Sequence, residues 1–222
     1  MKKLFILWAM LLAWLYSFAQ TDPLREKLDS VFQHVNKSLI PTGYLKEYGA
    51  EFMPLHCFNG VLTDSNVVTN LDAFRFAYTD LSTAKIQPSL PDMPALTAVN
   101  ARIDSLRGGA ASPVALLYGS YASLRDDALA QNLMTLSNEQ VFDVAGRTQS
   151  PYLTHTLFAA AAIHTRFRDT VRLTFNSALY YTNTGASVTA LWVDFKDGAG
   201  YQAIPAGATL TKVYADSTGL KM

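Results

Sequence analysis

The sequence contains only one cysteine, Cys57, among its 222 residues. One cysteine cannot form a disulfide within the chain, so stability must come from the burial of apolar side chains. His56 is the nearest candidate base in the sequence, but neighbours in an extended segment point to opposite faces. We therefore interpret Cys57 as a small buried hydrophobic residue rather than as a nucleophile.

An excess of charge of either sign is also absent. The 18 basic residues balance the 18 acidic residues, and no block of like charge occurs along the chain. Because nucleic-acid binding depends on clustered positive charge, we expect no nucleic-acid partner.

The motifs that mark common enzymes and cofactor sites are missing as well. The sequence has no Walker A loop, no His-Glu-x-x-His pair, no dinucleotide glycine fingerprint and no Gly-x-Ser-x-Gly elbow. Residues 119–123 (Gly-Ser-Tyr-Ala-Ser) resemble that elbow but lack its second glycine. We expect no catalytic residue, no cofactor and no metal site. This expectation favours a protein without enzymatic activity, but it does not exclude an enzyme.

The histidines show no metal-ligand spacing, because the two nearest ones are separated by several residues. We interpret them as isolated surface or hydrogen-bonded residues. The four are His34, His56, His155 and His164.

The N-terminus carries the one long apolar run. Lys2 and Lys3 precede an apolar stretch at residues 4–15, and small residues follow up to Ala19. This pattern is typical of a signal peptide cleaved between Ala19 and Gln20. The stretch of about twelve residues is shorter than the roughly twenty of a membrane-spanning helix, so an uncleaved anchor is the weaker alternative. We predict export to the periplasm or the cell surface, with membrane contact only before cleavage.

Apolar periodicity predicts three helices in the first half of the mature chain. The first spans residues 22–39, with Pro23 in its first turn and Pro41 as its stop. The second begins near Asn70, which can cap it. Phe76 lies off its apolar stripe, which predicts burial on more than one side. The third spans residues 95–106 and ends at a Gly-Gly pair. The stripe of the second helix is Leu71, Phe74, Ala77, Tyr78 and Leu81.

Strand signals dominate the second half. Asn183-Thr-Gly185 and Lys196-Asp-Gly198 supply the residues that tight turns need. We predict extended segments at residues 114–121, 140–144, 152–163, 171–175 and 188–195. A helix is the alternative for residues 152–163, because Ala159 to Ala162 favour one.

The fold class predicted from these patterns is α+β. Residues 1–19 form the signal peptide, residues 20–111 a mainly helical region and residues 112–222 a β-rich region. Strands of this length at close spacing suggest an antiparallel sandwich.

Two resemblances refine this expectation. Residues 192–198 (Trp-Val-Asp-Phe-Lys-Asp-Gly), followed by Val213-Tyr214 and Gly219-Leu220, resemble the polycystic-kidney-disease (PKD) type of immunoglobulin-like domain. The resemblance implies a PKD-like β-sandwich from about residue 170. Its last strand would run beyond Met222, so we expect the sandwich to be either incomplete or closed in a different way.

A second resemblance covers most of the mature chain. It is similar to the N-terminal region of uncharacterised secreted proteins of the Bacteroidota, which implies export and layout but no known activity. Members of that family often continue further, so we expect the end at Met222 to mark a truncated copy. The matching segments are residues 40–49, 58–64, 157–160 and 194–201.

Aromatic side chains in the β-rich region are the candidate ligand contacts. Tyr180, Tyr181, Trp192 and Tyr201 would suit stacking on sugar rings or contact with a protein partner, although core packing is the alternative. The pair Asp194 and Asp197 is better explained by a turn than by calcium, which prefers six to eight oxygen ligands.

We therefore predict an exported, non-catalytic module for carbohydrate or protein binding at the cell surface or outside the cell. One alternative is the N-terminal part of a larger secreted hydrolase. A structural subunit of a surface assembly is another.

Overall fold

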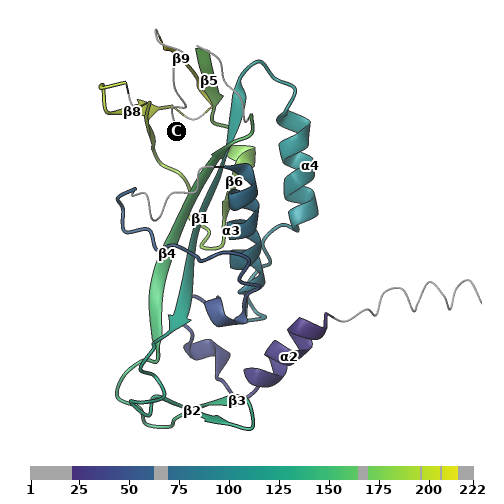
Figure 1. The fold of residues 1–222 in the computed structure, drawn as a ribbon, viewed down its shortest axis with the longest axis vertical. Helices are drawn as coiled ribbons and strands as arrows, with labels where there is room; N and C mark the ends of the chain where they lie inside the picture. Colours follow the sequence, from purple (N-terminus) through teal and green to yellow (C-terminus); the bar gives the residue numbers. More distant parts are fainter. Residues whose placement is uncertain (1–21, 63–69, 165–169, 196, 206, 215–222) are drawn as a thin grey trace, which may run out of the picture. The chain divides into compact units, whose positions relative to one another are not determined.

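A computed structural model describes residues 22–62, 70–164, 170–195, 197–205 and 207–214 (Figure 1). Within these ranges the chain forms three α-helices and nine β-strands, which confirms the α+β class. The predicted signal peptide, with its cleavage site between Ala19 and Gln20, lies outside the described residues.

The chain divides into two compact units. One comprises Met1–Asn36 and Asp126–Ser150, and the other comprises Lys37–Arg125 and Pro151–Met222. The second unit takes residues from both the helical and the β-rich regions of the sequence, because the helices pack against the longest strands.

Helix α2 (Pro23–Val31) belongs to the first unit and begins as predicted. The main-chain N–H of Leu24 donates to Asp22 Oδ1 at 3.0 Å, so Asp22 caps the helix. The predicted end at residue 39 is wrong, because the helix stops at Val31. Phe32 and Val35 become buried by leaving the helical path, so tertiary burial overrides the apolar periodicity here.

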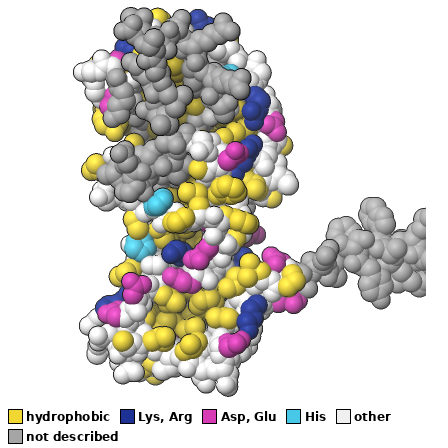
Figure 2. Space-filling view, in the orientation of Figure 1, with side chains coloured by type: hydrophobic (Ala, Val, Ile, Leu, Met, Phe, Trp, Pro, Cys, Tyr) yellow, Lys and Arg dark blue, Asp and Glu magenta, His cyan; other side chains and the backbone are white. Residues whose placement is uncertain are grey.

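A short hairpin completes the first unit. Strands β2 (Met134–Ser137) and β3 (Gln140–Asp143) are joined by Asn138 and Glu139, both with positive φ. Two such residues form the tight turn that matches the twist of a hairpin. Figure 2 shows hydrophobic side chains gathered on the face of this unit, and Leu136 is among the exposed ones.

The second unit is built on two long antiparallel strands, β1 (Ser112–Leu124) and β4 (Tyr152–Ala162). The extended interpretation of residues 152–163 is therefore confirmed. On its other side β1 pairs in parallel with β5 (Thr170–Thr174) and with β6 (Tyr180–Thr182). The sheet order is β4-β1-β5-β9, with β6 on β1.

Strand β9 (Thr209–Val213) pairs antiparallel with β5. Strands β7 (Leu191–Asp194) and β8 (Tyr201–Ile204) form a separate antiparallel hairpin. The parallel pairs of β1 were not predicted, since sequence patterns show that a segment is extended but not which strand it pairs with. Strand β7 is also shorter than the predicted 188–195.

Helices α3 (Leu71–Thr83) and α4 (Leu96–Leu106) cover one face of β1 and β4 (Figure 1). The main-chain N–H of Ala73 donates to Asn70 Oδ1 at 2.8 Å, so the predicted cap is confirmed. The whole predicted stripe of α3 is buried. Phe76, however, is 48% exposed. The prediction that α3 is also buried on the side that carries Phe76 is therefore wrong.

The two faces of β1 and β4 carry two clusters of apolar residues. Alternation along each strand sends successive side chains to opposite faces. The helix cluster includes Ala115, Leu117, Tyr121, Leu157 and Ala159 from the strands. The opposite cluster, called here the hairpin cluster, contains Val114, Leu116, Phe175 and Ile204, with Leu191 and Val193 of β7 packed against it.

Candidate functional site

Three polar side chains lie near the C-terminal end of β1, on the face of the helix cluster. The strand register pairs Tyr121 directly with His155 of β4, and their ring centroids are 5.1 Å apart. Ser123 lies two residues further along β1, so its side chain points to the same face as that of Tyr121. The pairing therefore gathers a phenol, an imidazole and a hydroxyl from two strands.

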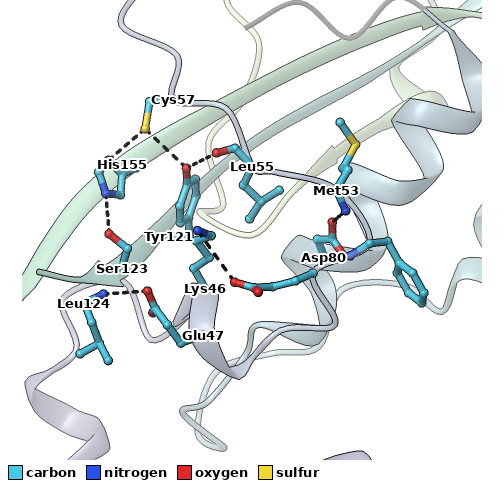
Figure 3. A network of polar contacts seen from close by, with 12 residues as sticks. Lys46, Glu47, Met53, Leu55, Cys57, Asp80, Tyr121, Ser123, Leu124 and His155 are labelled. Atoms are coloured by element: carbon cyan, nitrogen blue, oxygen red, sulfur yellow. Dashed lines mark hydrogen bonds and ion pairs between the residues drawn. The ribbon is translucent and has the colours of Figure 1, made fainter. Parts of the chain in front are cut away.

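The segment that carries Cys57 is held on both sides of this residue. The main-chain N–H of Phe58 donates to the carbonyl oxygen of Thr156 in β4 at 2.8 Å, and Thr156 Oγ1 donates to the Phe58 carbonyl oxygen. On the other side, the Tyr121 hydroxyl donates to the Leu55 carbonyl oxygen at 2.9 Å. These contacts direct the Cys57 side chain toward the polar group on β1 and β4 (Figure 3).

The sulfur of Cys57 contacts two of these groups. Sγ lies 3.1 Å from His155 Nδ1 and 3.5 Å from the Tyr121 hydroxyl oxygen. The other ring nitrogen of His155, Nε2, lies 2.8 Å from Ser123 Oγ (Figure 3). We name Cys57, His155, Ser123 and Tyr121 the thiol cluster.

This arrangement corrects the interpretation of Cys57 as a buried hydrophobic residue. Cys57 is exposed, because its segment runs along the outer edge of β4 instead of through the core. The candidate base beside Cys57 is therefore not its sequence neighbour His56. It is His155, which lies 98 residues away in the sequence. No local spacing signals this pair, because the hydrogen bonds of Leu55 to Tyr121 and of Phe58 to Thr156 create it.

Of the other histidines, His164 is hydrogen-bonded. Its Nε2 lies 2.8 Å from the Arg107 carbonyl oxygen. His34 stacks on Phe142 with ring centroids 4.4 Å apart. These two residues fit the interpretation as surface or hydrogen-bonded histidines, whereas His155 joins the thiol cluster.

The electrostatics of the thiol cluster favour a neutral imidazole. Burial lowers the pKa of His155, and the positive charge of Lys46 lowers it further. Burial raises the pKa of the Tyr121 hydroxyl, and the hydrogen bond to Cys57 adds to this increase. At neutral pH the phenol therefore keeps its proton, and His155 can accept one.

Two carboxylates hold the chain around the cluster. Glu47 Oε1 accepts the main-chain N–H of Leu124 at 3.1 Å. Asp80 of α3 is 2% exposed and accepts the main-chain N–H groups of Phe52 at 2.7 Å and Met53 at 2.9 Å. Asp80 thus connects α3 to the segment that leads to the thiol cluster (Figure 3).

The pH dependence of stability should reveal the buried carboxyl of Asp80. Burial raises the pKa of Asp80 and outweighs the lowering by the two amide donors. The folded state then binds a proton on the Asp80 carboxyl more tightly than the unfolded state does. In the unfolded state an aspartate carboxyl titrates at about pH 3.9. We expect the free energy of unfolding of the wild type, relative to Asp80→Asn, to be largest at acidic pH. It should decrease as pH rises through the raised pKa.

Urea denaturation of both proteins between acidic and neutral pH measures this difference. A relative stability of the wild type that increases with pH would contradict the raised pKa of Asp80.

The four candidate ligand-contact aromatics divide into two pairs. Tyr181 is 7% exposed and belongs to the helix cluster, and Tyr180 is half-buried against the hairpin cluster. Trp192 and Tyr201, in contrast, are 61% and 58% exposed. Only the second pair presents aromatic rings to solvent.

The remaining sequence motifs have structural explanations. Asp197 Oδ1 accepts the main-chain N–H of Ala199 at 3.0 Å, and Asp197 also pairs with Lys212, which confirms the turn interpretation. Gly198, beside it, has a φ of +86°. Gly119 lies inside strand β1 rather than at a strand-to-helix turn, so it forms no nucleophile elbow.

Comparison with known proteins adds no functional assignment. The chain matches no protein-family model, no curated protein and no solved structure. The PKD-like and Bacteroidota resemblances therefore remain predictions from the motifs that carry them.

The described residues contain no group of three or more His, Cys, Asp and Glu side chains that could hold a metal ion. In the described ranges, no helix is both long enough and apolar enough to cross a membrane.

Proposed function

We propose that the protein is an exported binding module that contacts a polysaccharide through Trp192 and Tyr201. The observation that carries this proposal is the exposure of both rings on one face of the β7–β8 hairpin. Trp192 is opposite Ala203, and Tyr201 is opposite Asp194. Residues directly opposite each other in an antiparallel pair share a face, so all four side chains lie on the same side.

The other face of the hairpin anchors it. Ile204 is buried, and Leu191 and Val193 pack against the hairpin cluster. An anchored hairpin presents its outer side chains in a defined geometry, which lowers the entropy that a ligand must offset on binding.

The composition of the outer face suits a sugar ring better than a large apolar partner. Trp192 faces the small, exposed side chain of Ala203 across the hairpin, so a flat ligand can approach the indole ring. Asp194 places a carboxylate opposite Tyr201. Aromatic faces pack against the C–H groups of a pyranose, and carboxylate oxygens accept hydrogen bonds from its hydroxyls.

The proposal includes a PKD-like module from about residue 170. Two features of the described residues support it. The aromatic strand β7 leads into the Asp197-Gly198 turn, and the Tyr214 hydroxyl donates to the Phe195 carbonyl oxygen at 2.9 Å. This contact ties the residue after β9 to the residue after β7, and a tyrosine hydroxyl bonded to an upstream main-chain carbonyl is also a feature of immunoglobulin-like sandwiches.

Export is proposed on the N-terminal pattern of basic, apolar and small residues. Expression in a bacterial host followed by N-terminal sequencing of the processed chain tests it. A mature chain beginning at Gln20 supports export, whereas a protein retained in the cytoplasm with Met1 intact contradicts it.

Substitution of Trp192 tests the binding proposal. We expect the protein to be retarded in native gels that contain a neutral polysaccharide, drawn from a panel of cellulose, xylan, chitin and β-glucan derivatives. Loss of the indole in Trp192→Ala should weaken binding about tenfold, because aromatic anchors dominate such interfaces. Tyr201→Ala should weaken it less.

Phe76→Ala provides the matched control, since Phe76 is also an exposed aromatic residue but lies on α3. This variant should bind like the wild type. Failure of every polysaccharide in the panel to retard the wild type, or equal retardation of the wild type and Trp192→Ala, would refute the proposal.

A further inference from the structure

The thiol cluster is separate from the aromatic face of the hairpin and has its own chemistry. We propose that Cys57 is a nucleophilic thiol, with His155 as its base, that exchanges with low-molecular-weight disulfides and is thereby S-thiolated. This activity goes beyond polysaccharide binding, and neither depends on the other.

The first support is the pairing of a nucleophile with an oriented base. Cys57 Sγ and His155 Nδ1 are 3.1 Å apart, which is within reach for proton transfer. His155 is oriented in turn by Ser123, whose Oγ lies 2.8 Å from Nε2. A nucleophile, a base and a third group that orients the base form the arrangement that activates thiols in many proteins.

Ser123 also determines which ring nitrogen is available. A serine hydroxyl can accept a hydrogen bond, so it can hold the proton of His155 on Nε2. Nδ1 then carries the lone pair and faces the thiol of Cys57. When Nδ1 takes the thiol proton, the Nε2–H bond to Ser123 is retained, so the imidazolium needs no reorientation.

The second support is the rigid placement of an exposed sulfur. Leu55 and Phe58, on either side of Cys57, are bonded to Tyr121 and Thr156 respectively. Because the hydroxyl hydrogen of Tyr121 goes to the Leu55 carbonyl, Tyr121 acts as a positioning residue. The segment thus keeps the sulfur beside its base, while the exposure of Cys57 lets a reagent reach it.

Disulfide exchange is the reaction that these groups can complete. The proton of Cys57 passes to His155 Nδ1, and the thiolate attacks one sulfur of the incoming disulfide. A new S–S bond forms, the S–S bond of the reagent breaks, and the departing sulfur leaves with the electron pair. His155 returns the proton to this leaving thiolate. One thiol and one disulfide enter and leave, so no further oxidant is needed.

The product should persist on the chain. The sequence holds no second cysteine, so no thiol of the same chain can attack the mixed disulfide and release the adduct. Acyl transfer would need, in addition, donors directed at an oxyanion, whereas disulfide exchange requires only access and proton transfer. These conditions point to a stable modification site.

The test is the rate of reaction of the purified, reduced full-length chain with glutathione disulfide and with a chromogenic aromatic disulfide. At neutral pH we expect His155→Gln to react about tenfold more slowly than the wild type, because the thiol loses its base. The rate for His155→Gln should increase with pH into the alkaline range, whereas that of the wild type should level off earlier. Mass spectrometry should show one glutathionyl group per chain, absent in Cys57→Ser.

His56→Gln is the matched control, because His56 adjoins Cys57 in the sequence, and its rate should stay within about twofold of the wild type. Ser123→Ala provides a second variant in case His155→Gln does not fold, and its rate should fall between the two. Equal rates and equal pH profiles for the wild type, His155→Gln and Ser123→Ala would overturn the proposal. The same holds for a wild-type rate no higher than that of free glutathione.

Discussion

Phe74→Ala should lower the free energy of unfolding by about 3–5 kcal/mol, the cost of emptying a core aromatic site. Phe74 is 0% exposed at the centre of the helix cluster. Its ring centroid lies 6.5 Å from that of Tyr78 and 6.3 Å from that of Tyr181. Two aromatic neighbours would lose their packing partner, and the rigid sheet beneath them cannot collapse to fill the space.

Phe76→Ala is the control for this prediction. Phe76 lies on the same helix, two residues further on, and is half exposed. Its replacement should change the free energy of unfolding by less than about 1 kcal/mol. Urea denaturation followed by circular dichroism measures both variants. Equal losses for the two would show that Phe74 does not form the core of this unit.

Gly119→Ala should destabilise the protein by about 1–3 kcal/mol through overpacking. A Cβ at this position would lie 2.4 Å from Leu81 Cδ2 and 3.1 Å from Asn183 Oδ1. Leu81 is fully buried on α3, so its side chain has little space in which to move. Asn183 is also constrained, because its side chain bonds both main-chain groups of Ser120 at 2.8 and 2.9 Å.

A double-mutant cycle separates this contact from other effects. In a Leu81→Ala background the space for a methyl group exists, and alanine in a strand interior is about 0.5–1 kcal/mol more favourable than glycine. Gly119→Ala should then be neutral or stabilising, so the two substitutions should couple. Gly108→Ala, where a Cβ meets nothing within 4 Å, is the control and should change little. Additive effects of the two substitutions would contradict the clash.

Local sequence signals predicted the elements whose causes are local. Helix α3 follows from one apolar stripe and a cap at Asn70, and both are confirmed. Helix α4 starts and ends within one residue of its predicted bounds. Strand β1 was likewise predicted, from its compact apolar run with Tyr118 and Tyr121. Residues 152–163 were interpreted as extended although their alanines favour a helix, and β4 confirms the extended interpretation.

The errors occur where a distant contact competes with a local preference. The first helix stops at Val31, although the periodicity continues, because Phe32 and Val35 are buried outside the helix. Phe76 was expected to be buried, but it is 48% exposed and lies outside the helix cluster, against which the apolar stripe of α3 packs. In both cases the arrangement of neighbours determines which apolar residues are covered.

For the four candidate aromatic residues, too, the sequence predicted the region but strand pairing determined the exposure. Sequence composition placed Tyr180, Tyr181, Trp192 and Tyr201 in the β-rich region but could not distinguish the sheet from the hairpin. Pairing with β1 places Tyr181 in the helix cluster. Pairing within β7–β8 leaves Trp192 and Tyr201 on the outer face. Which aromatic ring reaches solvent is therefore a consequence of strand pairing.

For the single cysteine, the amino-acid sequence and the tertiary structure determine different properties. The amino-acid sequence alone establishes that Cys57 has no disulfide partner in its own chain, and periodicity predicts the main helices and the long strands. Only the tertiary structure brings His155 to within 3.1 Å of the sulfur and Ser123 to the far side of the imidazole. The register of β1 and β4, which is set by side-chain packing along both strands, places Ser123 and Tyr121 beside His155. The hydrogen bonds of Leu55 to Tyr121 and of Phe58 to Thr156 then bring the Cys57 sulfur to the imidazole. No local pattern connects these residues, because they are far apart in the sequence.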